Sequence, residues 1–202
     1  GRVIYVGSER IDDVTRHPAF RAAAQTAAAI YDLKADPASR DVMSYEEDGG
    51  RHSIYYLRPK SRDDLQRRME GHRRIADFTH GLFGRSPDHF ASYVTGMSMN
   101  PGALPAPHGF GDNLLKYYRH MRDNDTYVSH AVVPPQAARN PEFYQRKNIA
   151  APTLRVVREH DDGVVISGMK MLATAAAYAN EIWIGNVIPL APDQKKEAIT
   201  CA

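Results

Sequence analysis

The stretch NLLKYYRHMRDNDTYVSHAVV, residues 113–133, contains the change of pattern that decides the fold. In its first half, Leu114, Leu115, Tyr118 and Met121 recur at the spacing that places side chains on one face of a helix. Its second half, TYVSHAVV, is a short β-branched run that is typical of a strand. The change predicts that a helical region ends near residue 124 and a strand region begins after it.

The residues before this point are expected to be mainly helical. RVIYV and ERIDDV, which flank Gly7 and Ser8, predict a small hairpin. Ser61 and Asp64 form an aspartate variant of the capping box. Helices are expected over residues 18–33, from residue 61, over 87–99 and over 112–123. SIYYLR, ending before Pro59, is expected to be extended.

The residues after this point contain short strand-like runs bounded by Pro, Gly, Asp or Asn, namely APTLRVVREH, GVVISGMKML and EIWIGNVI. Helices followed by strands predict an α+β fold and not alternating βαβ units. GFGDNL follows a loop and is a poor match to a dinucleotide fingerprint, so a Rossmann sheet is not expected. The predicted domains are 1–124, mainly helical, and 125–202, mainly strand.

Composition narrows the possible functions. The 202 residues are 43% hydrophobic and 25% charged with a net charge of +2, which is typical of a globular domain. Basic residues alternate with acids, as in SRDDLQRRMEGHRR, which indicates a solvated helix face and no nucleic-acid partner. The apolar region 163–192 is broken by Lys170, Asn180 and Glu181, so no membrane span is expected.

Cys201 is the only cysteine, which excludes a disulfide framework or a thiolate metal cluster within this chain. No HExxH motif occurs among the nine histidines, and no metal site is expected. A reducing, cytoplasmic location is expected. The chain begins in one strand-like stretch and stops in another, which suggests a fragment.

GRSPDH contains the first candidate site. Ser86 suits a helix N-cap, Pro87 the first helical position and Asp88 the positive end of the helix dipole. Arg85 and His89 are expected to project to one side of this N-terminus, where they would bind an anionic oxygen. A surface arginine beside a packed histidine is the simpler interpretation of the motif alone.

Two further candidates lie in the strand region. His130 sits between apolar neighbours in an expected strand, and the polar residues Gln136 and Arg139 follow it. Thr174 lies in the small-residue run 173–177, where a flat ligand can approach the backbone and its hydroxyl can bond a ring heteroatom. A satisfied core histidine and a tightly packed strand crossing are the alternatives.

YYLRPKSRDDLQRRMEGHR, GRSPDH, NLLKYYRHMRDND, SHAVVPPQAAR and GMKMLATAAAYANE together, in this order, resemble the large oxygenase component of the two-component 4-hydroxyphenylacetate 3-monooxygenase family. The resemblance implies an acyl-CoA-dehydrogenase-like fold. Such a fold has an N-terminal helical domain, an antiparallel β-barrel domain and a C-terminal helical bundle, and the bundle is missing from this chain.

The resemblance also implies a reaction. A separate NAD(P)H-dependent flavin reductase supplies reduced FAD, and molecular oxygen adds to give a flavin C4a-hydroperoxide. This hydroxylates a 4-hydroxyphenylacetate-like phenol ortho to its hydroxyl and gives a catechol. The full-length protein would be a homotetramer.

Residue roles follow from the same resemblance. Arg85 would bind the phenol, and His130 would lie at the junction of flavin and substrate and meet Arg85 in a water-poor site. His89 stands where the family commonly has tyrosine, which leaves the phenol open. The expected flavin contacts are His130, Gln136, Arg139 and Thr174, and residues 189–193 would form part of a loop over the substrate.

Two other functions fit the same fold. An acyl-CoA-dehydrogenase-like enzyme would hold flavin tightly, whereas a dehydratase would need a cysteine-bound cluster that Cys201 alone cannot supply. A non-catalytic protein of this fold stays open because of His89 and the missing bundle.

Overall fold

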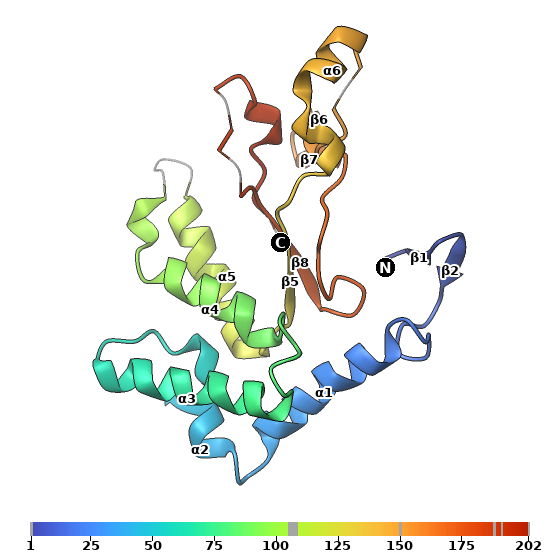
Figure 1. Cartoon of the computed structure of the whole chain (residues 1–202). Helices are drawn as coiled ribbons and strands as arrows, with labels where there is room; N and C mark the ends of the chain where they lie inside the picture. Colours follow the sequence, from blue (N-terminus) through green and yellow to red (C-terminus); the bar gives the residue numbers. More distant parts are fainter. Residues whose placement is uncertain (1, 105–108, 150, 188, 191, 202) are drawn as a thin grey trace. The chain divides into compact units, whose positions relative to one another are not determined.

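The computed structural model describes residues 2–104, 109–149, 151–187, 189–190 and 192–201 (Figure 1). The chain forms two compact units. The first contains Gly1–Val128 and Ala177–Asn180, and the second contains Ser129–Ala176 and Glu181–Ala202. The predicted functional domains, 1–124 and 125–202, stay a prediction.

The first unit is mainly helical, as predicted. Its elements are β1 (Ile4–Val6), β2 (Glu9–Ile11), α1 (Arg21–Ala35), α2 (Arg40–Met43), β3 (Ser44–Glu47), β4 (Gly50–Ser53), the 3-10 turn η1 (Ile54–Tyr56), α3 (Arg62–Phe78), α4 (Pro87–Ser98), η2 (Pro101–Ala103) and α5 (Phe110–Asn124). The N-terminal hairpin and all four predicted helices are confirmed. The capping box is also confirmed, because Asp64 N–H donates to Ser61 Oγ and Ser61 N–H donates to Asp64 Oδ2, both at 3.1 Å.

The core of this unit is built around η1, where the extended piece was expected. Ile54, Tyr55 and Tyr56 are fully buried. Side chains satisfy their backbone carbonyls in place of a neighbouring strand: Tyr118 Oη donates to Tyr56 O at 2.6 Å and Thr95 Oγ1 to Tyr55 O at 3.1 Å. The extended prediction for SIYYLR was therefore wrong for these three residues.

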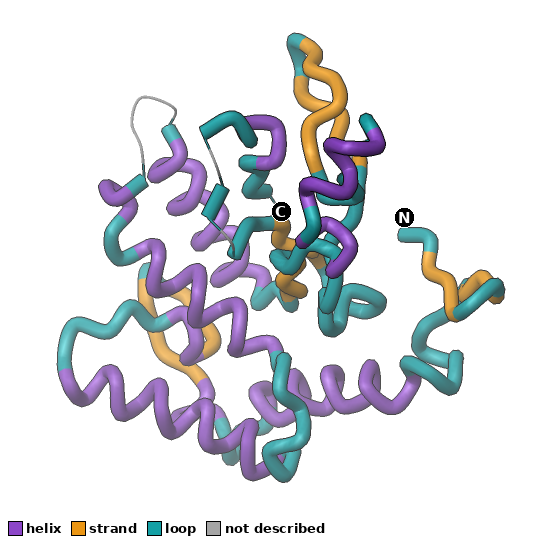
Figure 2. Tube along the Cα trace, turned by 45° about the horizontal axis from the view of Figure 1, so that its top comes forward, coloured by secondary structure: helices purple, strands orange, loops and turns teal. Residues whose placement is uncertain are grey.

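The β3–β4 hairpin was not predicted, and Figure 2 shows it among the helices of this unit. Its two strands are antiparallel, with Glu47 opposite Gly50. The connecting residues Asp48 and Gly49 have φ values of 53° and 76°, which match the two left-handed positions of a type I′ turn. The Asp-Gly dipeptide was a usable hairpin signal, but the polar sequence around it favoured a loop.

The second unit contains β5 (Val128–Ala131, whose first residue belongs to the first unit), η3 (Gln136–Arg139), α6 (Pro141–Lys147), β6 (Arg155–His160), β7 (Gly163–Ser167), β8 (Glu181–Ile184) and η4 (Lys195–Glu197). The four predicted strands are confirmed, whereas α6 was not predicted. β5 pairs with β8, and β6 pairs antiparallel with β7.

The expected closed β-barrel is not present among the described residues. Their strands form two-stranded sheets, with isolated bridges such as Val133–Met171 and Thr153–Met169 outside them. Barrel closure needs an unbroken ladder around the whole circumference. The small-residue run after Leu172 forms turns and adds no strand to these sheets.

Candidate functional site

The N-terminus of α4 presents the first pair of candidate residues. Ser86 occupies the N-cap position and Pro87 the first helical position, as predicted. The Ser86 hydroxyl makes no cap bond to the helix backbone and instead donates to Asp88 Oδ1. This leaves the first backbone N–H groups of the helix unbonded by a cap side chain, in the position where helix termini receive anions.

Arg85 and His89 lie next to each other at this terminus, and both are exposed. Arg85 Nη1 is hydrogen-bonded to His89 Nε2. A guanidinium can only donate, so Nε2 is the acceptor and the imidazole is neutral. Burial and the neighbouring Arg85 charge lower the pKa of His89 below its ordinary 6.5, which agrees with this neutral form. The two side chains project to one side, as the sequence predicted.

Asp88 links the first turn of α4 to the helix α3. His72 Nδ1 in α3 lies 2.6 Å from Asp88 Oδ2, and the His72 ring stacks on Tyr55 with centroids 5.6 Å apart. Burial acts to raise the pKa of Asp88, but the hydrogen bonds from His72 and Ser86 outweigh it and the pKa is lowered. Asp88 is therefore an ionised acceptor that joins two helices.

The backbone of Arg85 is also held. Tyr127 Oη donates to Arg85 O at 2.5 Å, which ties the residue before the N-cap to the start of the strand region. Sequence reasoning assigned no role to Tyr127 or His72. Their hydrogen-bonding partners lie 42 and 16 residues away in the sequence, so no local spacing could have indicated these contacts.

The second unit carries the remaining candidates. His130 is half-buried in β5, between two buried neighbours, Ser129 and Ala131. Gln136 is exposed at the start of η3. Arg139 ends η3, and its side chain lies outside the described part of the structure. The roles expected of these residues stay predictions.

Thr174 is exposed and lies in a tight turn, not in a strand crossing. Its backbone carbonyl accepts a hydrogen bond of 2.8 Å from Ser129 Oγ, and its own N–H donates to Leu172 O at 3.0 Å. Its hydroxyl makes no hydrogen bond to the described residues, so that hydroxyl is available to a ligand. Ser129 was missed because a strand serine next to a candidate histidine carries no signal of its own.

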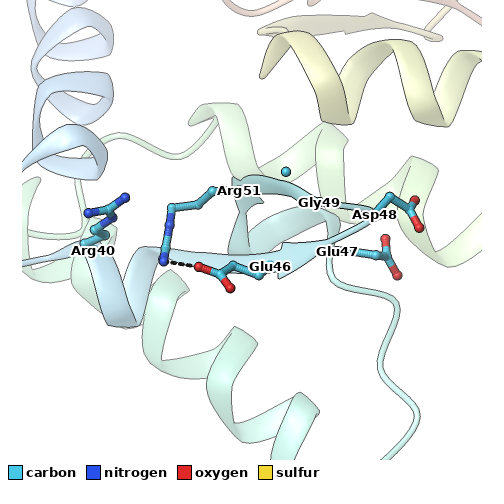
Figure 3. A pocket seen from close by; sticks show the side chains of 7 residues that line it. Arg40, Glu46, Glu47, Asp48, Gly49 and Arg51 are labelled. Carbon is cyan, nitrogen blue, oxygen red and sulfur yellow. Dashed lines mark hydrogen bonds and ion pairs between the residues drawn. The ribbon is translucent and has the colours of Figure 1, made fainter.

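One pocket on the first unit lies at the β3–β4 turn, and none of the predicted site residues lines it (Figure 3). Its acidic side chains and Arg51 pair with one another or with α5: Arg51 Nη2 bonds Glu46 Oε1 at 2.5 Å, and Arg122 Nη1 lies 2.8 Å from Glu47 Oε2. Figure 3 shows Arg51 directed at Glu46. These pairs brace the hairpin.

Residues 2–104 and the later described segments contain no group of three or more His, Cys, Asp or Glu side chains placed to hold a metal ion. No helix in the same segments is both long and apolar enough to cross a membrane. Of the loop expected at residues 189–193, residue 191 lies outside the described residues.

Known proteins are similar to this chain in sequence and in fold. A 4-hydroxyphenylacetate 3-monooxygenase oxygenase component of Thermus thermophilus is 34% identical over 199 residues, which cover 98% of this chain and 40% of that protein. A solved oxygenase component of 4-hydroxyphenylacetate 3-monooxygenase, complexed with FAD and 4-hydroxyphenylacetate, is 34% identical with a TM-score of 0.84 over 96% of this chain and 40% of its own. The chain thus spans about 40% of the length of these relatives.

A more distant structure shows the breadth of the fold. An archaeal 4-hydroxybutyryl-CoA dehydratase from N. maritimus is 18% identical with a TM-score of 0.80 over 97% of this chain, which is a likeness of fold alone. The family model described as 4-hydroxyphenylacetate 3-hydroxylase N terminal matches residues 1–202. The chain therefore belongs to the 4-hydroxyphenylacetate 3-hydroxylase family and carries its N-terminal region.

Proposed function

We propose that this chain forms the phenol-binding and part of the flavin-binding region of a reduced-FAD-dependent monooxygenase that hydroxylates a 4-hydroxyphenylacetate-like phenol ortho to its hydroxyl. Family membership supports the reaction class. The observation that carries the proposal is the Arg85–His89 pair at the N-terminus of α4, because it presents a fixed cation beside a neutral imidazole.

Arg85 binds the oxygen of the phenol in this proposal. A free phenol has a pKa of about 10, so most of it is protonated at neutral pH. An adjacent guanidinium favours the phenolate, and each unit of depression requires about 1.4 kcal/mol of preferential stabilisation. The phenolate ring is richer in electrons at its ortho carbon, which is the position to be hydroxylated.

His89 sets the orientation of that cation. Its neutral Nε2 accepts from Arg85 Nη1, which leaves the other guanidinium donors for the substrate. His130 is proposed to exchange the phenol proton as donor or acceptor, the role that the resemblance implies for it.

The described residues fit a flavin. Thr174 offers an unbonded, exposed hydroxyl next to small side chains, and Gln136 offers an exposed amide. We propose that these residues, with His130 and Arg139, contact FAD. The bound reduced flavin supplies the electrons that activate molecular oxygen, while the chain orients the phenol and excludes water from it.

The proposed partners follow from family membership. A separate NAD(P)H-dependent reductase would deliver the reduced FAD, and the complete protein would form a tetramer in the cytoplasm. A relative named as an oxygenase component implies such a second component.

The test is turnover of the protein with chemically reduced FAD, oxygen and a panel of para-substituted phenols, with catechols quantified by chromatography. Formation of a catechol in near-stoichiometric ratio to oxygen consumed supports the proposal. Peroxide without catechol for every phenol contradicts it. Purification with tightly bound oxidised flavin that acyl-CoA substrates reduce would identify a dehydrogenase instead.

A further inference from the structure

We propose that Ser129 is a positioning residue that fixes Thr174 for its contact with the flavin. This inference rests on the proposed function, because it assumes that Thr174 touches FAD. It adds a residue to which neither the sequence nor the relatives' names assign a role. All the contacts that carry it lie within the second unit.

The first observation is the hydrogen bond between the two segments. Ser129 is 1% exposed, and its Oγ donates to Thr174 O at 2.8 Å. Ser129 directly precedes His130 in β5, so one strand carries both the proposed proton-transfer residue and the anchor of the turn that holds Thr174.

The second observation is the backbone of that turn. Leu172 and Ala175, on either side of Thr174, have φ values of 59° and 71°. Residues with a Cβ disfavour this left-handed region, and two of them within four positions persist only where the surroundings hold them there. Ala175 is 8% exposed and lies against the packed interior, whereas Leu172 is 75% exposed.

The third observation is a set of hydrogen bonds that hold the chain just before the same turn. Met171 N–H donates to Val133 O at 2.8 Å. The ammonium of Lys170 donates to Gly185 O and to Asn186 Oδ1, both at 2.8 Å. These bonds fix the chain before Leu172, whereas Ser129 supplies the described side-chain bond inside the turn. Loss of the Ser129 hydroxyl therefore removes the bond that joins the Thr174 carbonyl to β5, while the flanking strands stay paired.

The first experiment measures FAD affinity, by anaerobic titration of reduced FAD, for the wild-type chain and four variants. Thr174→Val and Ser129→Ala should each raise the Kd, the second by about fivefold, which is the effect of losing one neutral hydrogen bond. Ser129→Thr should restore wild-type affinity because it keeps the donor. Ser98→Ala is the matched control, since Ser98 is 3% exposed and donates to Thr95 O at 2.7 Å in α4.

A double-mutant cycle separates positioning from general loosening. If Ser129 acts through Thr174, Ser129→Ala should raise the Kd by less than twofold in the Thr174→Val background. An undiminished fivefold effect in that background would overturn the inference. The inference would also be overturned if Ser129→Ala bound FAD with the wild-type Kd while Thr174→Val bound it more weakly. The proposed function would survive that result.

Hydrogen exchange gives a readout that needs no flavin. Ser129→Ala should accelerate exchange of the amides of Thr174 and Ala176 relative to Ser98→Ala, while the β6–β7 amides keep their rates. Unchanged exchange at the turn would overturn the inference. If Thr174→Val binds FAD with the same Kd as the wild-type chain, Thr174 does not contact the flavin as proposed. The role of Ser129 in flavin binding then fails as well.

Discussion

The ring of His72 in α3 donates a hydrogen bond of 2.6 Å to the carboxylate of Asp88 in the first turn of α4. Asp88 accepts on its other oxygen from Ser86, the N-cap of the same helix. The segment that carries Arg85 and His89 is thus fixed by one charged acceptor. In the proposed function Arg85 binds the phenol, and such a group requires this kind of support because a small displacement is costly to catalysis.

Replacement of Asp88 by asparagine should lower the free energy of unfolding by about 1 kcal/mol at neutral pH, because charge-assisted hydrogen bonds are roughly twice as strong as neutral ones. The folded-state pKa of Asp88 lies below its ordinary 3.8. Its contribution is therefore fully present above pH 3.8 and is lost as the pH falls through the folded-state pKa. Urea unfolding of both proteins from pH 7 down to pH 3 measures this. A difference that grows on acidification would contradict the assignment.

Arg85→Ala should keep flavin oxidation and lose productive hydroxylation, so that peroxide replaces catechol as the product. The physical reason is that the guanidinium favours the phenolate, and without it the phenol stays protonated and poorly oriented. The measurement is the ratio of catechol to peroxide per oxygen consumed. Arg74→Ala, at an exposed position of α3, is the matched control and should keep the wild-type ratio. Normal coupling in Arg85→Ala would remove Arg85 from the site.

Protonation of His89 should abolish activity on the acidic side of the pH profile. The imidazolium has no lone pair for Arg85, so the orienting hydrogen bond breaks when His89 gains a proton. Because the pKa of His89 is lowered below 6.5, the fall in kcat/KM should lie below pH 6.5. His89→Gln keeps an acceptor that does not titrate and should lack this acidic fall. A profile identical to wild type in His89→Gln would exclude His89 from the site.

His89→Tyr introduces the tyrosine that the resemblance implies for this position and should change selectivity among phenols. A hydroxyl that can donate replaces a nitrogen that accepts, so we expect the ratio of kcat/KM for 4-hydroxyphenylacetate to that for 4-methylphenol to rise by about tenfold. Parallel turnover assays of both phenols measure the ratio. An unchanged ratio would show that position 89 does not contact the substrate.

Gly71→Ala should destabilise the first unit, whereas Gly96→Ala should not. A Cβ at Gly71 would lie 2.4 Å from Ile54 Cγ2 in the buried core, while a Cβ at Gly96 would have no neighbour within 4 Å. Overpacking is expected to cost about 2 kcal/mol at Gly71, and alanine in a helix is expected to gain about 0.5–1 kcal/mol at Gly96. Thermal unfolding of the two variants tests the contrast. Equal Tm values would mean that α3 moves to accommodate the methyl group.

Sequence reasoning was most successful where the signal is local. Hydrophobic spacing, the Ser61 cap and the Ser86-Pro87 helix start located α1, α3, α4 and α5 within a few residues, whereas the short helix α2 was missed. It failed at Ile54–Tyr56, where distant side chains satisfy the backbone, and at the barrel, because a list of strands does not reveal whether their ladders close. The closeness of Arg85 and His89 was predicted because Arg85 directly precedes the N-cap and His89 lies in the first turn of α4.

The sequence by itself determined the helices α1, α3, α4 and α5, the strands β5–β8, the family and the neighbouring position of Arg85 and His89. Each depends on residues close together in the chain or on a motif order that can be read directly. Only the tertiary structure decided which groups support them. His72, Tyr127 and Ser129 reach their partners across 16 to 45 residues of chain. Packing brings such partners together. The sequence around a hydrogen-bonding side chain does not indicate which distant backbone group or carboxylate it will contact.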